Sequence, residues 1–405
     1  MANVSSSNGL EKRPKLRFPG FDEPWSVYKA EELFKNVADK NHSAETVLTI
    51  IQGKGTLPRE QAGRNIHYDD SSLANYKKVE QGDFIIHLRS FEGGLEMANE
   101  DGIVSPAYTI LRCKKPHSSL FYEAYFHTDE FINHILSKSV EGIRDGRQIS
   151  YEAFKWLGLP YCNVSEQEKI AQLFCTLDHR IEKQQQMVDA LKKYKRGLLR
   201  TMFSEKGNHS FLHDAVSHRI DEVCDVLSGK RIPKGETFST HPTEYRYITV
   251  SDMGEKYVRS NTVQYITSHT EKQIARYKVR NGDIIISVAG TLGKLNIIAS
   301  DLDGVNLTEN CDRFTNFRGI NPEYLYHVLS SDLIQSQIEA SKTKNGQPKL
   351  ALERIRNFVV PVPHQVWQEQ FAEVMNGIDK HIASQQAILD RCCKVRVGLL
   401  QQLFI

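Results

Sequence analysis

Residues 159–203 of this chain read LPYCNVSEQEKIAQLFCTLDHRIEKQQQMVDALKKYKRGLLRTMF, and residues 360–404 read VPVPHQVWQEQFAEVMNGIDKHIASQQAILDRCCKVRVGLLQQLF. A shift of 201 positions aligns the two stretches without a gap. The alignment gives 14 identities in 45 positions, among them Asp178 with Asp379. The chain is therefore built as two similar halves, and this repeat indicates a task with two-fold symmetry.

Both copies have the periodicity of a coiled-coil helix. Apolar residues recur at alternating spacings of four and three, as the a and d positions of a heptad do. A polar residue interrupts this seam at matching columns, where Gln184 aligns with Gln385 and Lys195 with Arg396; such residues fix the register at some cost in stability. The predicted seam is Ile170, Phe174, Leu177, Ile181, Gln184, Val188, Leu191 and Leu198 in the first copy, and Phe371, Met375, Ile378, Ile382, Gln385, Leu389, Leu399 and Leu403 in the second.

The connection between the helices favours antiparallel pairing. A helix of about 39 residues is roughly 58 Å long, and a long segment of different sequence lies between the two copies. An antiparallel pair would place the two globular parts at opposite ends, related by a pseudo-two-fold axis. A parallel pair would crowd both parts at one end. A coiled coil between two separate chains stays open as an alternative.

The globular parts repeat more faintly. YKKVEQGDFIIHL at 76–88 matches YKVRNGDIIISV at 277–288, and in both a Gly-Asp turn leads into an apolar run typical of a buried strand. Helical patterns follow at 120–137 and 322–340. We therefore predict an α+β fold with a pseudo-two-fold internal repeat, in which two mixed α/β domains are separated by two long helices that form an antiparallel coiled coil. The predicted limits are 1–14 for a disordered N-terminal segment, 15–158 for the first domain, 159–206 for the first long helix, 207–359 for the second domain and 360–405 for the second long helix.

Composition excludes several classes of protein. The chain has 405 residues, of which 40% are apolar, and a formal net charge of +2, so it can bury more than one core and is no polycation. No apolar run reaches the roughly 18 residues of a membrane span, and the N-terminus lacks an apolar signal core. Seven cysteines without a C-x-x-C pair fit reduced thiols better than disulfides or a zinc site. We expect a cytoplasmic protein without membrane contact.

Motifs for catalysis are weak. Asn321-Pro322-Glu323-Tyr324 differs at its third position from the N-P-P-Y motif of adenine methyltransferases, and an N-cap followed by proline explains it as a helix start. The segment 290–294, GTLGK, has the wrong spacing for a phosphate loop. The sequence contains neither H-E-x-x-H nor G-x-S-x-G. We therefore predict no catalytic residues, no metal site and no bound cofactor in this chain.

Taken in order, the motifs resemble those of the specificity subunit of type I restriction-modification enzymes. The resemblance is carried by PKLRFPGFDEPW near the N-terminus, by QGDFIIHL and NGDIIISV, by NPEYLYHVL, and by P-x6-Q-E before each helix that ends in G-L-L-x-x-x-F. It covers essentially the whole chain. It implies two target-recognition domains that each read one half of a bipartite DNA site, with the coiled coil between them.

The same resemblance implies the partners. These are double-stranded DNA, two modification subunits that bind S-adenosylmethionine and methylate adenine, and restriction subunits that use ATP and Mg²⁺ for translocation and cleavage. The long helices would be the docking surface for the modification subunits. The chain itself would read DNA and do no chemistry.

Candidate DNA contacts are basic residues in glycine-containing loops. Arginine and lysine read guanine edges in the major groove or hold phosphates, although each such residue can also be merely solvated. Arg89 and Lys294 rank first because each follows a Gly-Asp strand at a matching place. The candidates are Lys54, Arg59, Arg64, Arg89, Arg144 and Arg147 in the first domain, and Lys230, Arg231, Lys234, Lys294, Lys342 and Lys344 in the second.

Two other functions remain open from the sequence. The chain could be an autonomous DNA adenine methyltransferase with unrecognised motifs, which would transfer a methyl group without a second polypeptide. It could also be a coiled-coil scaffold without a DNA role, which would bind no bipartite duplex preferentially even with modification subunits present.

Overall fold

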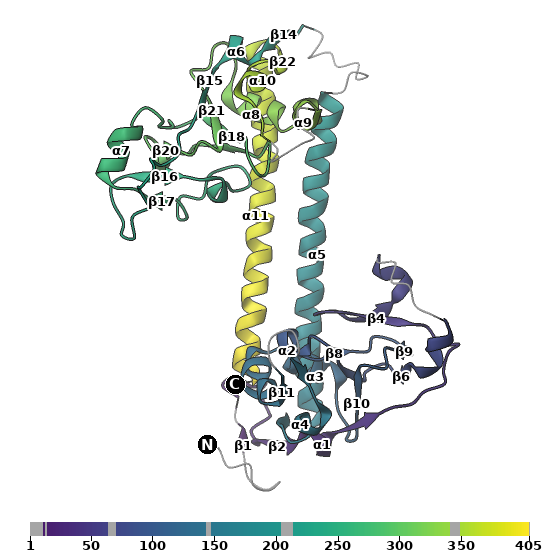
Figure 1. Cartoon of the computed structure of the whole chain (residues 1–405). Helices are drawn as coiled ribbons and strands as arrows, with labels where there is room; N and C mark the ends of the chain where they lie inside the picture. The colour runs from purple at the N-terminus through teal and green to yellow at the C-terminus, as the bar shows by residue number, and fades with distance from the viewer. Residues whose placement is uncertain are drawn as a thin grey trace. The chain divides into compact units, whose positions relative to one another are not determined.

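The chain forms two compact units, and each contains part of both long helices. The first unit comprises Met1–Gln185 with Ala387–Ile405, and the second comprises Gln186–Gln386. Helix α5 (Val164–Met202) and helix α11 (Gln365–Phe404) are drawn in teal and yellow in Figure 1. This computed structural model describes residues 11–12, 14–63, 70–142, 147–203, 214–340 and 349–404.

The first unit is built around a four-stranded antiparallel sheet with the strand order β3-β10-β7-β8. Its strands are β3 (Phe34–Val37), β7 (Phe84–Ile86), β8 (Glu96–Met97) and β10 (Thr109–Cys113). The other strands are β1 (Glu11–Lys12), β2 (Trp25–Lys29), β4 (Leu48–Ile51), β5 (Gly55–Pro58), β6 (Lys77–Val79), β9 (Gly102–Val104), β11 (Val140–Glu141), β12 (Gln148–Ile149) and β13 (Gly158–Tyr161). The short helices are α1 (Ala30–Leu33), α2 (Ser90–Gly93), α3 (Ser119–Phe126) and α4 (Tyr151–Phe154), with 3-10 turns at Arg59–Ala62, Asp70–Asn75 and Leu136–Ser139 and a π-helical turn at Glu130–Ile135.

The second unit repeats this plan. Its four-stranded sheet has the order β15-β21-β18-β19, which matches the first sheet strand for strand. The strands are β14 (Val216–Arg219), β15 (Asp225–Ser228), β16 (Arg246–Ile248), β17 (Gln264–Tyr265), β18 (Ile284–Ser287), β19 (Leu295–Ile297), β20 (Asn306–Leu307), β21 (Cys311–Thr315) and β22 (Val359–Val362). The helices are α6 (Ile220–Val223), α7 (Ser268–Ile274), α8 (Pro322–Leu329), α9 (Asp332–Ala340) and α10 (Leu352–Arg356), with 3-10 turns at Val250–Asp252 and Ser300–Leu302. The predicted fold class, mixed helix and strand in a repeated plan with two long helices, is confirmed.

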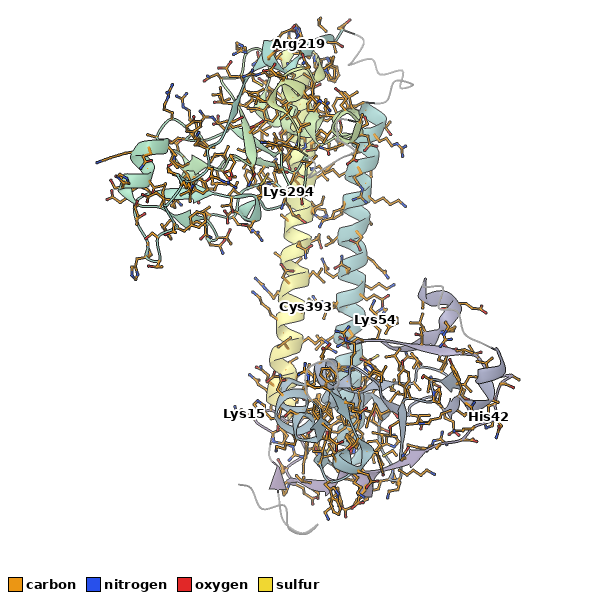
Figure 2. The ribbon with its side chains drawn as sticks, in the orientation of Figure 1. Lys15, His42, Lys54, Arg219, Lys294 and Cys393 are labelled. Atoms are coloured by element: carbon orange, nitrogen blue, oxygen red, sulfur yellow. The ribbon has the colours of Figure 1, made fainter. Side chains whose placement is uncertain are left out.

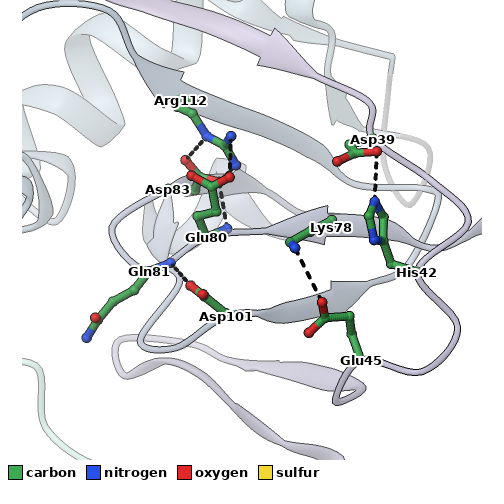
Figure 3. A network of polar contacts seen from close by, with 9 residues as sticks. All are labelled: Asp39, His42, Glu45, Lys78, Glu80, Gln81, Asp83, Asp101 and Arg112. Atoms are coloured by element: carbon green, nitrogen blue, oxygen red, sulfur yellow. Dashed lines mark hydrogen bonds and ion pairs between the residues drawn. The ribbon is translucent and has the colours of Figure 1, made fainter.

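The Gly-Asp turns have a structural role, which Figure 3 shows for the first unit. The Asp83 side chain accepts the backbone N–H of Glu80 at 2.9 Å. It also accepts two hydrogen bonds from the Arg112 guanidinium, at 2.9 and 2.7 Å, which raise the pKa of that arginine. In the second unit Asp283 accepts the backbone N–H of Arg280 at 2.8 Å. Each turn is thus closed by its own aspartate ahead of a buried strand.

An aromatic cluster around Phe404 forms much of the core of the first unit. The Phe404 ring is fully buried, and its centroid lies 6.0 Å from that of Trp25, 5.2 Å from Phe121, 5.5 Å from Tyr125 and 6.3 Å from Phe174. Phe174 belongs to the beginning of α5 and Phe404 is the last residue of α11. Within this unit the two helices therefore run antiparallel.

The second unit has the reciprocal arrangement. Phe203, which corresponds to Phe404 in the repeat, follows the last residue of α5. Its ring lies 5.6 Å from that of Phe371 near the start of α11, and 6.4 Å from that of Tyr324. The end of one helix again packs against the beginning of the other, so the pairing is antiparallel in this unit as well.

Each unit also contains an ion pair between the two helices. In the first unit, Arg396 of α11 contacts Asp178 of α5 with two nitrogens, one of them 3.1 Å from an aspartate oxygen. In the second unit, Lys195 Nζ of α5 lies 2.5 Å from Asp379 Oδ1 of α11. The two pairs occupy the same columns of the repeat. The basic residues that interrupt the predicted seam are therefore neutralised across it.

A buried glutamine joins each long helix to its globular domain. Gln167 and Gln368 correspond in the repeat and are at most 1% exposed. Their side-chain oxygens accept the backbone N–H of Ser118 at 3.0 Å and of Asn321 at 2.7 Å, at the starts of α3 and α8. The two domains are thus attached to the helices in the same way, in spite of their different sequences.

The N-terminal segment packs on the end of α11 in the first unit. The backbone N–H of Leu16 donates to the carbonyl of Gln402 at 3.0 Å. Arg17 and the Trp25 indole both donate to the carboxylate of Glu166, which is 1% exposed. The segment predicted to be disordered comprises residues 1–14. Its residues 1–10 and 13 lie outside the described residues, whereas Glu11 and Lys12 form β1, which pairs with β2.

Phe404→Ala is expected to lower the free energy of unfolding by about 3–5 kcal/mol, because it leaves a cavity among four aromatic rings. Urea unfolding followed by tryptophan fluorescence measures this, since Trp25 touches Phe404. The control is Val397→Ala on the same helix, where the side chain is 54% exposed and the expected change is within about 0.5 kcal/mol. Equal losses for the two variants would show that Phe404 is not a core residue.

Candidate nucleic-acid interface

Two of the first-domain candidates lie at helix α2. Arg89 precedes helix α2, is 69% exposed and forms an ion pair with Glu92 at 3.0 Å. The guanidinium of Arg147 lies 4.5 Å from the ring centre of Phe91 in α2. The helix thereby brings together two arginines that are far apart in the sequence.

Two further candidates belong to the β4–β5 hairpin and the turn that follows it. Lys54 is exposed in the hairpin loop (Figure 2). Arg59 lies in the next 3-10 turn, with its guanidinium 5.9 Å from the ring centre of Tyr76. The exposed position of Lys54 leaves its ammonium available to a phosphate.

The three candidates of the second domain that follow β15 lie on one loop. Lys230, Arg231 and Lys234 are all exposed. The ammonium of Lys230 lies 5.8 Å from the ring centre of Tyr277, and Arg231, which is 81% exposed, pairs with Glu309 at 2.8 Å. This loop is the most basic exposed segment among the predicted contacts that the structure describes.

Lys294 has a different environment from the one that the sequence led us to expect. Its Nζ donates to the carbonyl oxygen of Met253 at 2.5 Å, and the side chain is half-buried. It therefore joins two segments of its own domain. The remaining candidates, Arg64, Arg144, Lys342 and Lys344, lie outside the described residues.

A buried carboxylate that the sequence analysis missed shapes the loop of Lys54. Glu96 of β8 is fully buried and accepts the backbone N–H groups of Gly53 at 2.7 Å and Gly55 at 2.9 Å. His127 lies 3.4 Å from the same carboxylate. Burial opposes the charge on both groups, but the hydrogen bonds between them keep the pKa of Glu96 below its ordinary value and that of His127 above it. The buried Glu96 carboxylate therefore fixes the backbone of this loop.

The second domain uses an amide for the same purpose. Asn296 of β19 is fully buried, and its side-chain oxygen accepts the backbone N–H of Gly254 at 2.8 Å. Glu96 and Asn296 lie 200 positions apart, close to the period of the helix repeat. Each of the two residues lies in the short strand that follows the Gly-Asp strand. This matching position is the sequence signal that could have identified them.

The predicted seam residues of α5 and α11 are all buried or half-buried. The buried ones are Ile170, Phe174, Val188, Phe371, Met375, Ile382, Leu389 and Leu403, and the half-buried ones are Leu177, Ile181, Gln184, Leu191, Leu198, Ile378, Gln385 and Leu399. The heptad analysis missed Leu199 and Leu400, which are 5% and 6% exposed. They lie beside the seam near each helix end, where the buried face is broader than two columns.

A second, exposed column of apolar residues follows each helix. In the second unit it holds Tyr194 of α5 and Trp367 and Val374 of α11, which are 48–61% exposed. In the first unit it holds Ile388 and Val395 of α11, which are 37% and 46% exposed. On α11 Trp367 and Val374 are seven positions apart, as are Ile388 and Val395, and His381 occupies the same heptad column between the two pairs. Exposed apolar stripes of this kind mark contact surfaces for other proteins.

Catalytic chemistry has little support in the described residues. They contain no group of three or more His, Cys, Asp or Glu side chains that could hold a metal ion. Burial raises the pKa of Cys224 and of Cys311 to about 12, so neither thiol is a ready nucleophile at neutral pH. In the same part of the chain, no helix is long and apolar enough to cross a bilayer.

Comparisons with known proteins agree on one family. A family model described as the type I restriction modification DNA specificity domain matches residues 213–391. The type I restriction enzyme EcoBI specificity subunit of Escherichia coli is 27% identical over 143 residues, which are 33% of this chain and 30% of that protein. The alignment thus spans less than a third of the length of this curated relative.

Solved structures share the fold over almost the whole chain. The crystal structure of the type I restriction-modification S subunit from M. genitalium matches with a TM-score of 0.58 and 15% identity, over 97% of this chain and 99% of that one. A structure from work on complex assembly and conformational transition of the type I restriction-modification system matches with a TM-score of 0.57 and 15% identity, over 95% and 98%. At this identity the two likenesses bear on the fold alone. The family model and the curated relative thus show that part of this chain is similar to the specificity subunits of type I restriction-modification enzymes, and the solved structures show that the chain shares the fold of such subunits.

Proposed function

We propose that this chain reads a bipartite sequence in double-stranded DNA, with one half-site for each globular domain. The observation that carries the proposal is one domain plan that occurs twice with different exposed residues. Both sheets have the same strand order, and both domains tether a glycine loop to a buried polar side chain. One plan with different loops fits two ligands of one chemical class and different sequence.

The exposed cations supply the physical means of recognition. Arg89 and Arg147 in the first domain, and Lys230, Arg231 and Lys234 in the second, are exposed and close to loops. Arginine can make two hydrogen bonds to a guanine edge, whereas lysine contributes salt-dependent affinity for phosphates. In this proposal the two sets differ because the two half-sites differ.

The long helices determine the length of DNA left unread between the half-sites. Helices of 39 and 40 residues are rigid elements of about 60 Å each. Two readers that approach B-DNA from one side meet the major groove at intervals of about 34–36 Å. In this proposal the length of the helix pair selects one spacer length.

Chemistry belongs to partner subunits in this proposal. Modification subunits carry S-adenosylmethionine and methylate adenine, and restriction subunits use ATP and Mg²⁺ to translocate and cleave DNA. The chain contributes the recognition of the DNA sequence and binds none of these cofactors itself. It acts where the genome lies, in the cytoplasm.

The docking surface for the modification subunits is the exposed stripe beside the seam. Tyr194, Trp367 and Val374 in the second unit, and Ile388 and Val395 in the first, place apolar side chains in water on both long helices. A partner helix laid along this stripe would bury them, as in a larger helical bundle.

Domain replacement tests the reading of half-sites. A chimaera in which residues 15–158 come from another specificity subunit, expressed with the modification subunits, should methylate a bipartite site with one new half and one old half. Replacement of 207–359 is the matched control and should change the other half. Single-molecule mapping of methyladenine gives both motifs. A change of both halves by one replacement would contradict independent reading.

Val374→Glu tests the docking stripe. The side chain is 61% exposed, so the change should leave folding intact and weaken binding of the modification subunits at least tenfold, because it buries a charge in an apolar contact. Gln370→Glu adds the same charge on an exposed part of the same helix, outside the stripe, and should bind as the unchanged chain does. Titration calorimetry with purified modification subunits measures both. Equal affinity of the two variants would remove the stripe from the interface.

A further inference from the structure

In the second unit, Lys256 connects the globular domain to helix α11. Its Nζ lies 2.6 Å from Asn376 Oδ1, 2.9 Å from Glu323 Oε2 and 3.6 Å from Asp379 Oδ2. The lysine side chain is 13% exposed. Two of the three partners belong to α11 and the third to α8, so one ammonium group connects a loop, a domain helix and a long helix.

The charges around Lys256 balance only while it is present. Asp379 also receives Lys195 of α5 at 2.5 Å, so two lysines face the two carboxylates of Asp379 and Glu323. Nearby His327 is fully buried. Burial, together with the positive charges of Lys195 and Lys256, lowers the pKa of His327 to about 4, which keeps the imidazole neutral. Without Lys256, two carboxylates would share a single cation.

The oxygens that face Lys256 depend on it. Glu323 Oε2 and Asp379 Oδ2 are buried, and among the described residues neither accepts a hydrogen bond. The Lys256 ammonium is therefore the charge that offsets both atoms. Removing it would leave Lys195 as the one cation for both carboxylates, which favours a rearrangement that brings water to these two oxygens.

The loop that carries Lys256 is also fixed at other points. Residues 253–257 include Glu255, which pairs with Lys192 of α5 at 2.7 Å. They include Gly254, whose backbone is hydrogen-bonded to Asn296 of the domain sheet. The loop therefore connects the sheet that presents the domain to both long helices of the same unit.

A groove of about 700 Å³ lies against this connection. Its lining includes Lys256 and Tyr257 of the domain loop, Lys192 of α5 and Ile382 of α11. The loop is thus not packed tightly against the helices on every side. Once its ion pairs are removed, the domain has room to tilt on the helix pair.

The corresponding loop of the first unit is fixed in another way. Gly53 and Gly55 are bonded to Glu96, which belongs to the domain itself. Within the described residues, no ion pair connects Lys54 to a long helix. The charged connection through a glycine loop therefore distinguishes the second unit.

We infer that Lys256 is a positioning residue, which sets how strictly this protein discriminates the spacer length of its DNA site by fixing the second domain on the helix pair. The inference rests on the proposed function. A spacer longer or shorter by one base pair moves a half-site by about 3.4 Å along the DNA axis. A rigidly attached domain cannot follow this shift, whereas a domain that tilts can.

The test uses the full chain assembled with its modification subunits and three duplexes that carry the same half-sites with the native spacer, one base pair fewer and one more. For the unchanged protein, the affinity ratio between native and altered spacers should be at least about a hundredfold. In Lys256→Met this ratio should fall at least tenfold while discrimination of the half-sites themselves persists. Lys256→Arg, which keeps the charge, should restore most of the ratio.

Two further variants keep the test decisive. Lys272→Met removes an exposed lysine of α7 in the same domain and should retain the full ratio. Glu255→Gln changes a side chain that is 68% exposed, so it will fold even if Lys256→Met does not, and its ratio should also fall, by a smaller factor.

The outcomes are distinguishable. If Lys256→Met or Glu255→Gln weakens binding to all three duplexes by the same factor, these residues serve stability alone and the inference is wrong, although the proposed function stands. If the unchanged assembly prefers no bipartite duplex at all, the proposed function fails and the inference fails with it.

Discussion

The register of the two long helices depends on an ion pair that is found in both units. Asp178 meets Arg396 in the first unit, and Asp379 meets Lys195 in the second. A basic residue in a coiled-coil seam is unfavourable unless its charge is met, and a shift in register would leave it facing apolar side chains. The pairing is antiparallel in both units, so each unit joins the end of one helix to the beginning of the other. In each unit, the globular domain is attached to this helix pair.

The domains combine a constant attachment with variable surfaces. Gln167 and Gln368 bind the starts of α3 and α8 in the same way, so the base of each domain is fixed on its helix. Above that base, Glu96 and Asn296 hold glycine loops with different chemistry. The proposed function needs this division, because the geometry has to stay constant while the recognised sequence differs.

Much of this architecture could be predicted from the sequence, because it depends on local periodicity. Heptad spacing and a gapless repeat are visible in one chain, and they predicted the long helices and the doubled plan. Contacts between distant segments could not be predicted in this way. The partner of Lys294 is a carbonyl 41 residues away, and the role of Glu96 depends on a loop 41–43 positions earlier. Leu199 and Leu400 were missed because a heptad template counts two columns where the fold buries a wider face.

Inserting one heptad into both long helices, after Gln186 and after Ala387, tests the central claim most directly. These positions match in the repeat, and seven residues add about 10.5 Å to each helix, roughly the rise of three base pairs. The methyladenine map of cells that express the lengthened chain with its modification subunits should show the same two half-sites separated by a longer spacer. An unchanged spacer, or altered half-sites, would contradict the claim that the helices set the distance and the domains read the sequence.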